Sequence, residues 1–141
     1  FKSFHNRCFV YYKLGEFDSA VEDCTKAIEL DSSYSKAYNR RGLAYYKLGN
    51  YENSIADFDK AIELNPKFND AYYNRGNTHF HLGNFEQTIA DHTKAIELEP
   101  NNAIYFRGRS IVYRKMGKTD LAVKDEEKAK ELENNNKAKS E

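Results

Sequence analysis

The sequence predicts an all-α fold in which four helical hairpins stack side by side. A glycine recurs every 34 residues, at Gly15, Gly49, Gly83 and Gly117. Alanine and leucine columns keep the same period: Ala27, Ala61, Ala95 and Ala129, and Leu30, Leu64, Leu98 and Leu132. A period of this length is typical of helix-turn-helix units that stack into a solenoid, because one unit alone cannot bury its apolar face.

The period divides the chain into four repeats and a short end. These are residues 1–34, 35–68, 69–102 and 103–136, followed by 137–141 as a solvated tail or linker. In each repeat, apolar and small residues recur at three- and four-residue intervals on both sides of the glycine, which indicates two helices of roughly a dozen residues. Gly49 favours the left-handed conformation that ends the first helix of its repeat, and Pro66 stops the second helix.

The first repeat opens on apolar residues without a polar cap. These residues are Phe1, Phe4, Phe9 and Val10. We therefore expect further chain upstream of them, or self-association through this amino-terminal end.

The fourth repeat is expected to end the stack. Its second helix, from about Asp120 to Leu132, carries Lys124, Glu126 and Lys130 at positions where the earlier repeats carry Glu or Ala, an aromatic residue and Ile. A terminal repeat has no neighbour on one side, so that side must face water.

Composition indicates a soluble protein without a membrane partner. Hydrophobic residues make up 40% of the chain and charged residues 31%, with 22 basic and 22 acidic side chains. No run approaches the ~18 apolar residues of a membrane helix. Two cysteines are too few for a disulfide-stapled secreted scaffold, so we expect a reduced, cytoplasmic setting.

The second repeat carries the markers of a known family. They are Tyr38, Gly42, Tyr45, Ser54, Phe58, Ala61 and Pro66. In this order and spacing they resemble the tetratricopeptide repeat (TPR) family, and the resemblance extends over essentially the whole chain. The other repeats depart from the pattern at Cys8, Cys24 and Ser32, at His79 and His92, and at Ser110, Glu126 and Asn134. The resemblance implies a right-handed superhelical solenoid.

Two charged columns recur in step with the repeat. They are Arg7, Arg41, Arg75 and Arg109 in the first helices, and Asp23, Asp57, Asp91 and Asp125 in the second helices. We expect a structural ladder of ion pairs between packed helices, because a matched partner offsets the cost of burying each charge. The alternative is that the arginines bind a ligand.

The cysteines and histidines are interpreted as packing residues. Cys8 and Cys24 replace a glycine and an aromatic at the helix–helix contact, so they are expected to be neighbours that behave as small apolar side chains. His79 and His92 replace core aromatics, while His79 and His81 point to different faces of one helix, which opposes shared metal coordination. We predict no metal, no cofactor and no enzymatic activity, because acidic residues recur with the repeat instead of converging on a site.

The family resemblance also implies where a partner would bind. In TPR proteins the first helix of each repeat lines a concave groove. The matching candidates are Asn6, Phe9, Tyr12, Lys13, Asn39, Arg40, Leu43, Tyr46, Lys47, Tyr73, Asn74, Asn77, Phe80, His81, Arg107, Ile111, Arg114 and Lys115. With Lys2, Lys36 and Asp70 on the same face, the formal charge of the groove is +7 in a chain whose total is zero.

These residues predict an adaptor or scaffold that binds an acidic, partly apolar peptide. The basic groove attracts acidic ligands, and an aromatic stripe of Tyr12, Tyr46 and Phe80 accepts apolar anchors. The alternatives are that the lysines only solvate the face, that the groove binds single-stranded nucleic acid, or that the chain associates with itself. Nucleic acid is less favoured because of the sequence pI of about 7.1. The carboxylate clamp of chaperone-binding TPR domains is matched only at Asn74 and is disfavoured.

Overall fold

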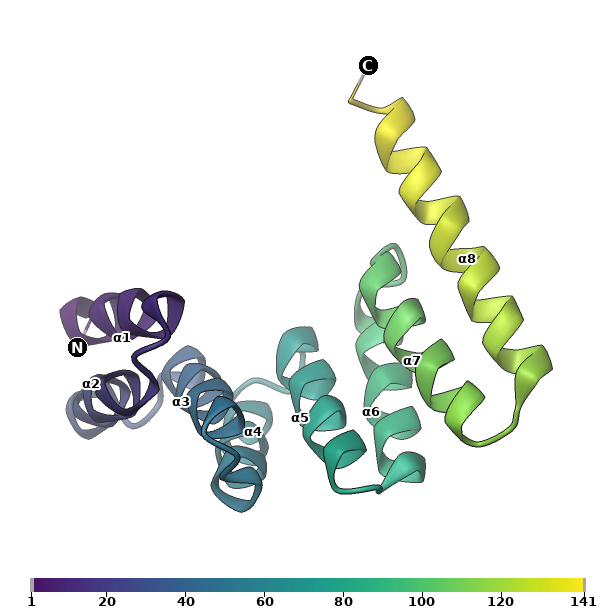
Figure 1. The fold of residues 1–141 in the computed structure, drawn as a ribbon. Coiled ribbons are helices and arrows are strands. Elements are labelled where there is room, and N and C mark those ends of the chain that lie inside the picture. Colours follow the sequence, from purple (N-terminus) through teal and green to yellow (C-terminus); the bar gives the residue numbers. More distant parts are fainter. Residues whose placement is uncertain (1, 141) are drawn as a thin grey trace.

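A computed structural model describes residues 2–140, and within this range the chain forms eight α-helices arranged as four hairpins (Figure 1). The helices are α1 (Lys2–Leu14), α2 (Phe17–Leu30), α3 (Ser35–Lys47), α4 (Tyr51–Leu64), α5 (Asn69–His81), α6 (Phe85–Leu98), α7 (Ala103–Lys115) and α8 (Thr119–Ala138). Each hairpin packs on the next along a curved row. The expected all-α solenoid is confirmed. Phe1, part of the predicted apolar amino end, lies outside the described residues.

The recurring glycines end the first helix of every hairpin in the predicted way. Gly15, Gly49, Gly83 and Gly117 have φ values of 81°, 76°, 77° and 72°. This is left-handed backbone, which glycine adopts without steric cost. In the second repeat the following N–H, from Asn50, donates to the carbonyl of Tyr45 at 2.9 Å and closes the helix end.

Small side chains let the two helices of a hairpin approach closely. Gly42 on α3 faces Phe58 on α4, and a Cβ added to Gly42 would lie 2.8 Å from Cε1 of that ring. Phe58, Ser54 and Ala61 are fully buried at this contact. The glycine and the aromatic ring therefore form one packing unit, and His92 takes the place of the ring against Gly76 in the third repeat.

The predicted ladder of ion pairs is present, and each pair lies within one repeat. Arg41–Asp57, Arg75–Asp91 and Arg109–Asp125 have N–O distances of 2.8, 2.7 and 2.7 Å, and Arg7 pairs with Asp23 in the same way. Both carboxylate oxygens of each aspartate accept a bond from the guanidinium. The bidentate geometry holds the two helices of a hairpin in register.

The two cysteines correct the sequence prediction. Cys8 and Cys24 are neighbours, as expected, but they form a disulfide between α1 and α2 instead of packing as free thiols. They occupy the positions that Gly42 and Phe58 hold in the second repeat, so the close helix approach brings their Cα atoms to 5.5 Å. The cysteines therefore give no support to the expected reduced, cytoplasmic setting, which stays a prediction.

The last helix is longer than predicted. α8 has 20 residues, against 14 in each of α2, α4 and α6, and it continues past Leu132 through Ala138. The expected helix end near Leu132 was wrong, because Asn134–Asn136 remain helical while exposed. Lys124 and Lys130 are also exposed, as expected for the outer face of a terminal repeat. The division between 1–136 and 137–141 stays a prediction.

Over residues 2–140, no helix has both the length and the apolar character required to cross a membrane.

His92 is buried, as predicted from its place in an aromatic column. Its side chain is 1% exposed, and its Nε2 lies 3.1 Å from Oδ1 of Asn77. Burial, with a smaller contribution from the charge of Arg109, lowers the pKa of His92 to about 4. His79, the other histidine at an aromatic position, is half-buried.

The buried histidine predicts a loss of stability in mild acid. Because the pKa of His92 lies below its unfolded value of ~6.5, protons bind the unfolded chain more tightly and stability falls as pH drops from 6.5 towards 4. At pH 5 this histidine alone is expected to cost about 2 kcal/mol relative to pH 7. Urea unfolding at both pH values measures the loss, and His92→Phe should reduce it. Equal losses in the variant and the parent would contradict the assignment to His92.

Candidate functional site

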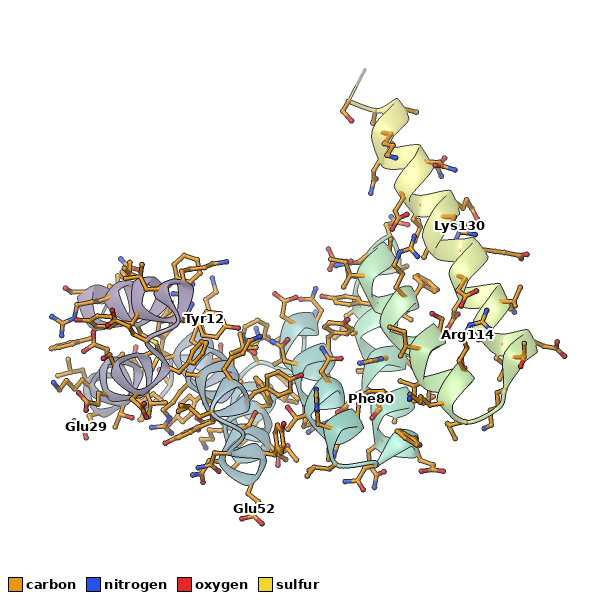
Figure 2. The ribbon with its side chains drawn as sticks, in the orientation of Figure 1. Tyr12, Glu29, Glu52, Phe80, Arg114 and Lys130 are labelled. Carbon is orange, nitrogen blue, oxygen red and sulfur yellow. A yellow bond between two sulfur atoms is a disulfide. The ribbon has the colours of Figure 1, made fainter. Side chains whose placement is uncertain are left out.

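The candidate groove residues all lie on the first helices of the hairpins. α1 contacts α3, α3 contacts α5 and α5 contacts α7, so these helices form one continuous face. We call it the first-helix face. Figure 2 marks Tyr12, Phe80 and Arg114 on α1, α5 and α7.

Arg40 is the centre of this face in the amino-terminal half. Its Nη1 donates to the backbone oxygen of His5 at 3.2 Å, and its guanidinium carbon lies 4.2 Å from the centre of the Phe9 ring. The side chain is half-buried, and burial lowers the pKa of Arg40. The contacts therefore fix the guanidinium between α1 and α3 without neutralising its charge.

Arg40 differs from every other arginine of the chain. The remaining six each form an ion pair with an aspartate or a glutamate: Arg7, Arg41, Arg75, Arg107, Arg109 and Arg114. Among residues 2–140, no carboxylate pairs with Arg40. A partly desolvated cation without an anion is costly, and a bound carboxylate would relieve that cost.

The surroundings of Arg40 are electropositive. His5 is buried, and its pKa is lowered to about 4 by burial first and then by the charges of Arg40 and Lys36. A hollow between α3 and α5 lies beside these residues. Its lining comprises Lys36, Asn39, Arg40, Phe68 and Asp70. Asp70 accepts a bond from the hydroxyl of Tyr105 at 2.8 Å.

Two candidate asparagines meet on this face and a third turns inward. Nδ2 of Asn74 donates to Oδ1 of Asn39 at 3.1 Å, which links α3 to α5. Asn77 instead lies against His92 in the interior. Tyr73 also packs inward, with its ring 4.7 Å from His92 and 4.9 Å from Tyr105. Tyr73 therefore serves the contact between the third and fourth hairpins, and Asn77 serves the contact between α5 and α6 within the third hairpin.

The expected aromatic stripe is wider than the sequence suggested. Each of its rings packs on the first residue of the following helix, in the pairs Tyr12–Phe17, Tyr46–Tyr51 and Phe80–Phe85, with centroids 5.7, 5.9 and 5.6 Å apart. His81 bridges two repeats, because its ring lies 5.2 Å from Tyr46 and 5.6 Å from Tyr51. Burial raises the pKa of Tyr12 and of Tyr46. The half-buried rings offer apolar surface at the ends of α1, α3 and α5.

The fourth repeat is less basic than its first helix alone suggests. Arg107 pairs with Glu133 at 2.6 Å and Arg114 with Glu126 at 2.6 Å, and both glutamates belong to α8. Arg114 lies between α7 and α8 (Figure 2). The expected formal charge of +7 on the face is therefore partly compensated at this end, and the unpaired positive charge lies towards the first three repeats.

The other candidates lie on the surface of the first helices. Leu43 is half-buried, and the exposed residues are Asn6, Phe9, Lys13, Lys47, His81, Ile111 and Lys115. Nζ of Lys13 lies 5.3 Å from the centre of the Phe9 ring, which adds a second cation to the Arg40 site.

Sequence reasoning missed three contributors to this face. Tyr51 was not proposed, although the aromatic residues that open the second helices recur with the period and gave a usable signal. Glu126 and Glu133 were not paired with arginines, because nothing in a linear sequence specifies contacts across 12 and 26 residues. Within residues 2–140, no group of three or more His, Cys, Asp or Glu side chains is placed to hold a metal ion.

The sequence matches two protein-family models. A family model described as tetratricopeptide repeat matches residues 35–68 and 70–102, and a second one, described as TPR repeat, matches residues 10–49. Together these matches cover well over half of the chain. No curated protein matches the sequence significantly.

The fold is similar to that of several solved structures. A crystal structure of MamA matches with a TM-score of 0.90 and 28% identity, over 98% of this chain and 80% of that chain. MamA (41-end) from Desulfovibrio magneticus RS-1 matches with a TM-score of 0.86 and 21% identity, over 95% and 76% of the two chains. The first TPR of Spaghetti (RPAP3), bound to the HSP90 peptide SRMEEVD, matches with a TM-score of 0.79 and 26% identity, over 82% and 91%.

Proposed function

The chain belongs to the tetratricopeptide repeat family, and on that premise we propose that it is a noncatalytic adaptor whose first-helix face binds an acidic peptide segment of a partner protein. The observation that carries the proposal is Arg40, a half-buried arginine that has no carboxylate partner among residues 2–140. A ligand carboxylate supplies the missing anion. His5 and Phe9 hold the guanidinium in place, so little conformational entropy is lost when the ligand binds.

The aromatic rings of the first-helix face favour a ligand that also has apolar side chains. Tyr12, Tyr46 and Phe80 present half-buried rings along the same three repeats that hold the unpaired positive charge. A peptide that places a carboxylate on Arg40 brings its neighbouring side chains to these rings. The proposed ligand is therefore acidic with apolar anchors.

A structural neighbour supports this choice of ligand. The first TPR of Spaghetti (RPAP3) is bound to a peptide, SRMEEVD, that contains two glutamates and one aspartate. The similar fold and the 26% identity support a peptide ligand for the present chain. Arg40 provides a different anchor from the clamp that the sequence fails to match.

A peptide array tests the proposal. The purified chain is passed over acidic, neutral and basic peptides at physiological salt, with a single-stranded oligonucleotide as competitor. We expect selective capture of acidic peptides that resists the competitor. For the peptide that binds most tightly, Arg40→Glu should weaken binding by roughly 10- to 100-fold, because the complex loses a charge-assisted hydrogen bond.

Two further variants make the result specific. Lys124→Glu applies the same change of charge on α8, away from the first-helix face, and should leave affinity unchanged. Arg40→Gln removes the charge without reversing it and should give an intermediate loss. Unchanged affinity in Arg40→Glu would contradict peptide binding at the first-helix face. Displacement of the peptide by the oligonucleotide would instead indicate a nucleic-acid ligand, and binding of that ligand should weaken steeply as the salt concentration rises.

A further inference from the structure

The hollow between α3 and α5 holds charges of both signs that do not pair. Lys36 and Arg40 bring two cations to it from α3, and Asp70 brings a carboxylate from α5. The volume of the hollow is about 230 Å³. Within residues 2–140, no ion pair joins Asp70 to either cation. Arg40 therefore stays without a carboxylate although one lines the same hollow.

Tyr105 holds the Asp70 carboxylate towards α7. The hydroxyl of Tyr105 donates to Oδ1 of Asp70 at 2.8 Å and accepts a bond from Nδ2 of Asn69 at 2.9 Å. The Tyr105 side chain is 2% exposed and its ring packs on that of Tyr73, with centroids 4.9 Å apart, so the hydroxyl has a fixed position. Burial, followed by the hydrogen bond and the charge of Asp70, raises the pKa of Tyr105, which keeps the hydroxyl protonated.

The neighbours of Tyr105 direct its proton to Asp70. Nδ2 of Asn69 also donates to Oε2 of Glu99 at 2.6 Å, and the same oxygen accepts a bond from Nδ2 of Asn102 at 3.0 Å. A hydroxyl has one proton to donate. Because Asn69 is a donor to Tyr105, the single proton of Tyr105 is available for Asp70.

Without this hydrogen bond, Asp70 has charged partners close by. The side chains of Asp70 and Lys36 are both exposed, and lysine carries its charge on a flexible stem. The two helices that carry them, α5 and α3, are in direct contact. A carboxylate released from Tyr105 is attracted to Lys36 and Arg40, because opposite charges near a protein surface interact more strongly than in bulk water. Such a pair would occupy the cations that an acidic ligand needs.

We propose that Tyr105 is a positioning residue, whose hydroxyl restrains Asp70 and so keeps Arg40 and Lys36 open to the carboxylate of a ligand. This role rests on the acidic peptide proposed for the first-helix face. It gives the fourth hairpin a part in binding, because α7 carries Tyr105 while the two cations lie on α3. Affinity then depends on the fraction of molecules in which Asp70 stays on Tyr105.

A crystal structure of the Tyr105→Phe variant without ligand tests the restraint. Phenylalanine keeps the buried ring and removes only the hydroxyl, so the packing on Tyr73 is retained. We expect a carboxylate oxygen of Asp70 within about 4 Å of Nζ of Lys36 or of the Arg40 guanidinium, which is the distance of an ion pair. An Asp70 side chain that keeps its parent position, or that turns to solvent, overturns the proposal.

Affinity for the acidic peptide tests the consequence. Tyr105→Phe should weaken binding about tenfold, the effect expected if Asp70 occupies the cations in about nine of ten molecules. Asp70→Asn should tighten binding, because it removes a charge of the same sign as the ligand from the hollow. The double variant should bind as tightly as Asp70→Asn alone, because a neutral amide does not compete for the cations. Tyr72→Phe is the matched control, since it removes a hydroxyl that donates to the backbone oxygen of Pro66 at 3.2 Å, and it should leave affinity unchanged.

The double variant separates positioning from a purely structural role. If the bond between Tyr105 and Asp70 only joined α5 to α7, Asp70→Asn would fail to tighten binding and the double variant would keep the loss seen in Tyr105→Phe. Either result overturns the proposal. A parent chain that binds no acidic peptide rejects the proposed function, and the crystal structure of Tyr105→Phe then still decides whether Tyr105 restrains Asp70.

Discussion

Replacing Asp57 with alanine is expected to lower the free energy of unfolding by roughly 3 kcal/mol, because it leaves Arg41 largely buried without an anion. Two hydrogen bonds of 2.8 Å join the pair, and only 17% of the Arg41 side chain is exposed. The remaining hydrogen bond of Arg41 goes to the hydroxyl of Thr25, a neutral acceptor that cannot compensate the charge. The shift of the urea midpoint at pH 7 measures the effect.

Two variants calibrate this loss. Asp57→Asn keeps the volume and one acceptor oxygen and should cost less, roughly 1–3 kcal/mol. Asp23→Ala breaks the equivalent pair at the end of the stack, where the Arg7 side chain is 53% exposed and water solvates the released guanidinium. Its cost should therefore be smaller than that of Asp57→Ala. Equal losses of unfolding free energy at the two sites would show that burial of the arginine does not determine how much each Arg–Asp pair contributes to stability.

Opening the disulfide is the second change with a large expected effect. The bond joins residues 16 apart in sequence and closes the loop between α1 and α2. A cross-link of this span is expected to contribute roughly 3 kcal/mol, chiefly by restricting the unfolded chain. Urea unfolding with and without a reductant should show this difference.

The variant Cys8→Ala with Cys24→Ala separates the bond from other effects of the reductant. Its stability should match that of the reduced parent and should not respond to reductant. A parent whose urea midpoint is the same in both conditions would show that the disulfide does not contribute to stability.

The sequence predicted the architecture because every element is specified by a local signal that recurs. A glycine needed at positive φ, such as Gly49, can be recognised from its period alone. The ladder was also predictable, because Arg41 and Asp57 recur at a constant separation that only a packed hairpin explains. Because each signal occurs in all four repeats, the four copies support the same interpretation, which a single repeat could not do.

The features that the sequence did not predict each occur once and do not recur with the repeat. Cys8 and Cys24 occur once, and their bond follows from a helix spacing that the sequence shows only indirectly. The last turns of α8 consist of exposed polar residues, and a segment of this composition is equally compatible with an unstructured tail. On the candidate face, Glu126 and Glu133 neutralise Arg114 and Arg107 through contacts that exist only in the fold. Periodicity located the first-helix face but did not show which of its charges are unpaired.

The disulfide also bears on how the surroundings of Arg40 lose order. In a row of hairpins that contact only their neighbours, order is lost from the ends. The two helices of the carboxyl-terminal hairpin are joined on this face by the solvent-exposed pairs Arg107–Glu133 and Arg114–Glu126, which water screens. The amino-terminal hairpin is tied by a covalent bond. Local opening of the amino-terminal hairpin therefore leaves α1 attached to α2 while the disulfide is intact, and α1 carries His5 and Phe9, which hold the Arg40 guanidinium.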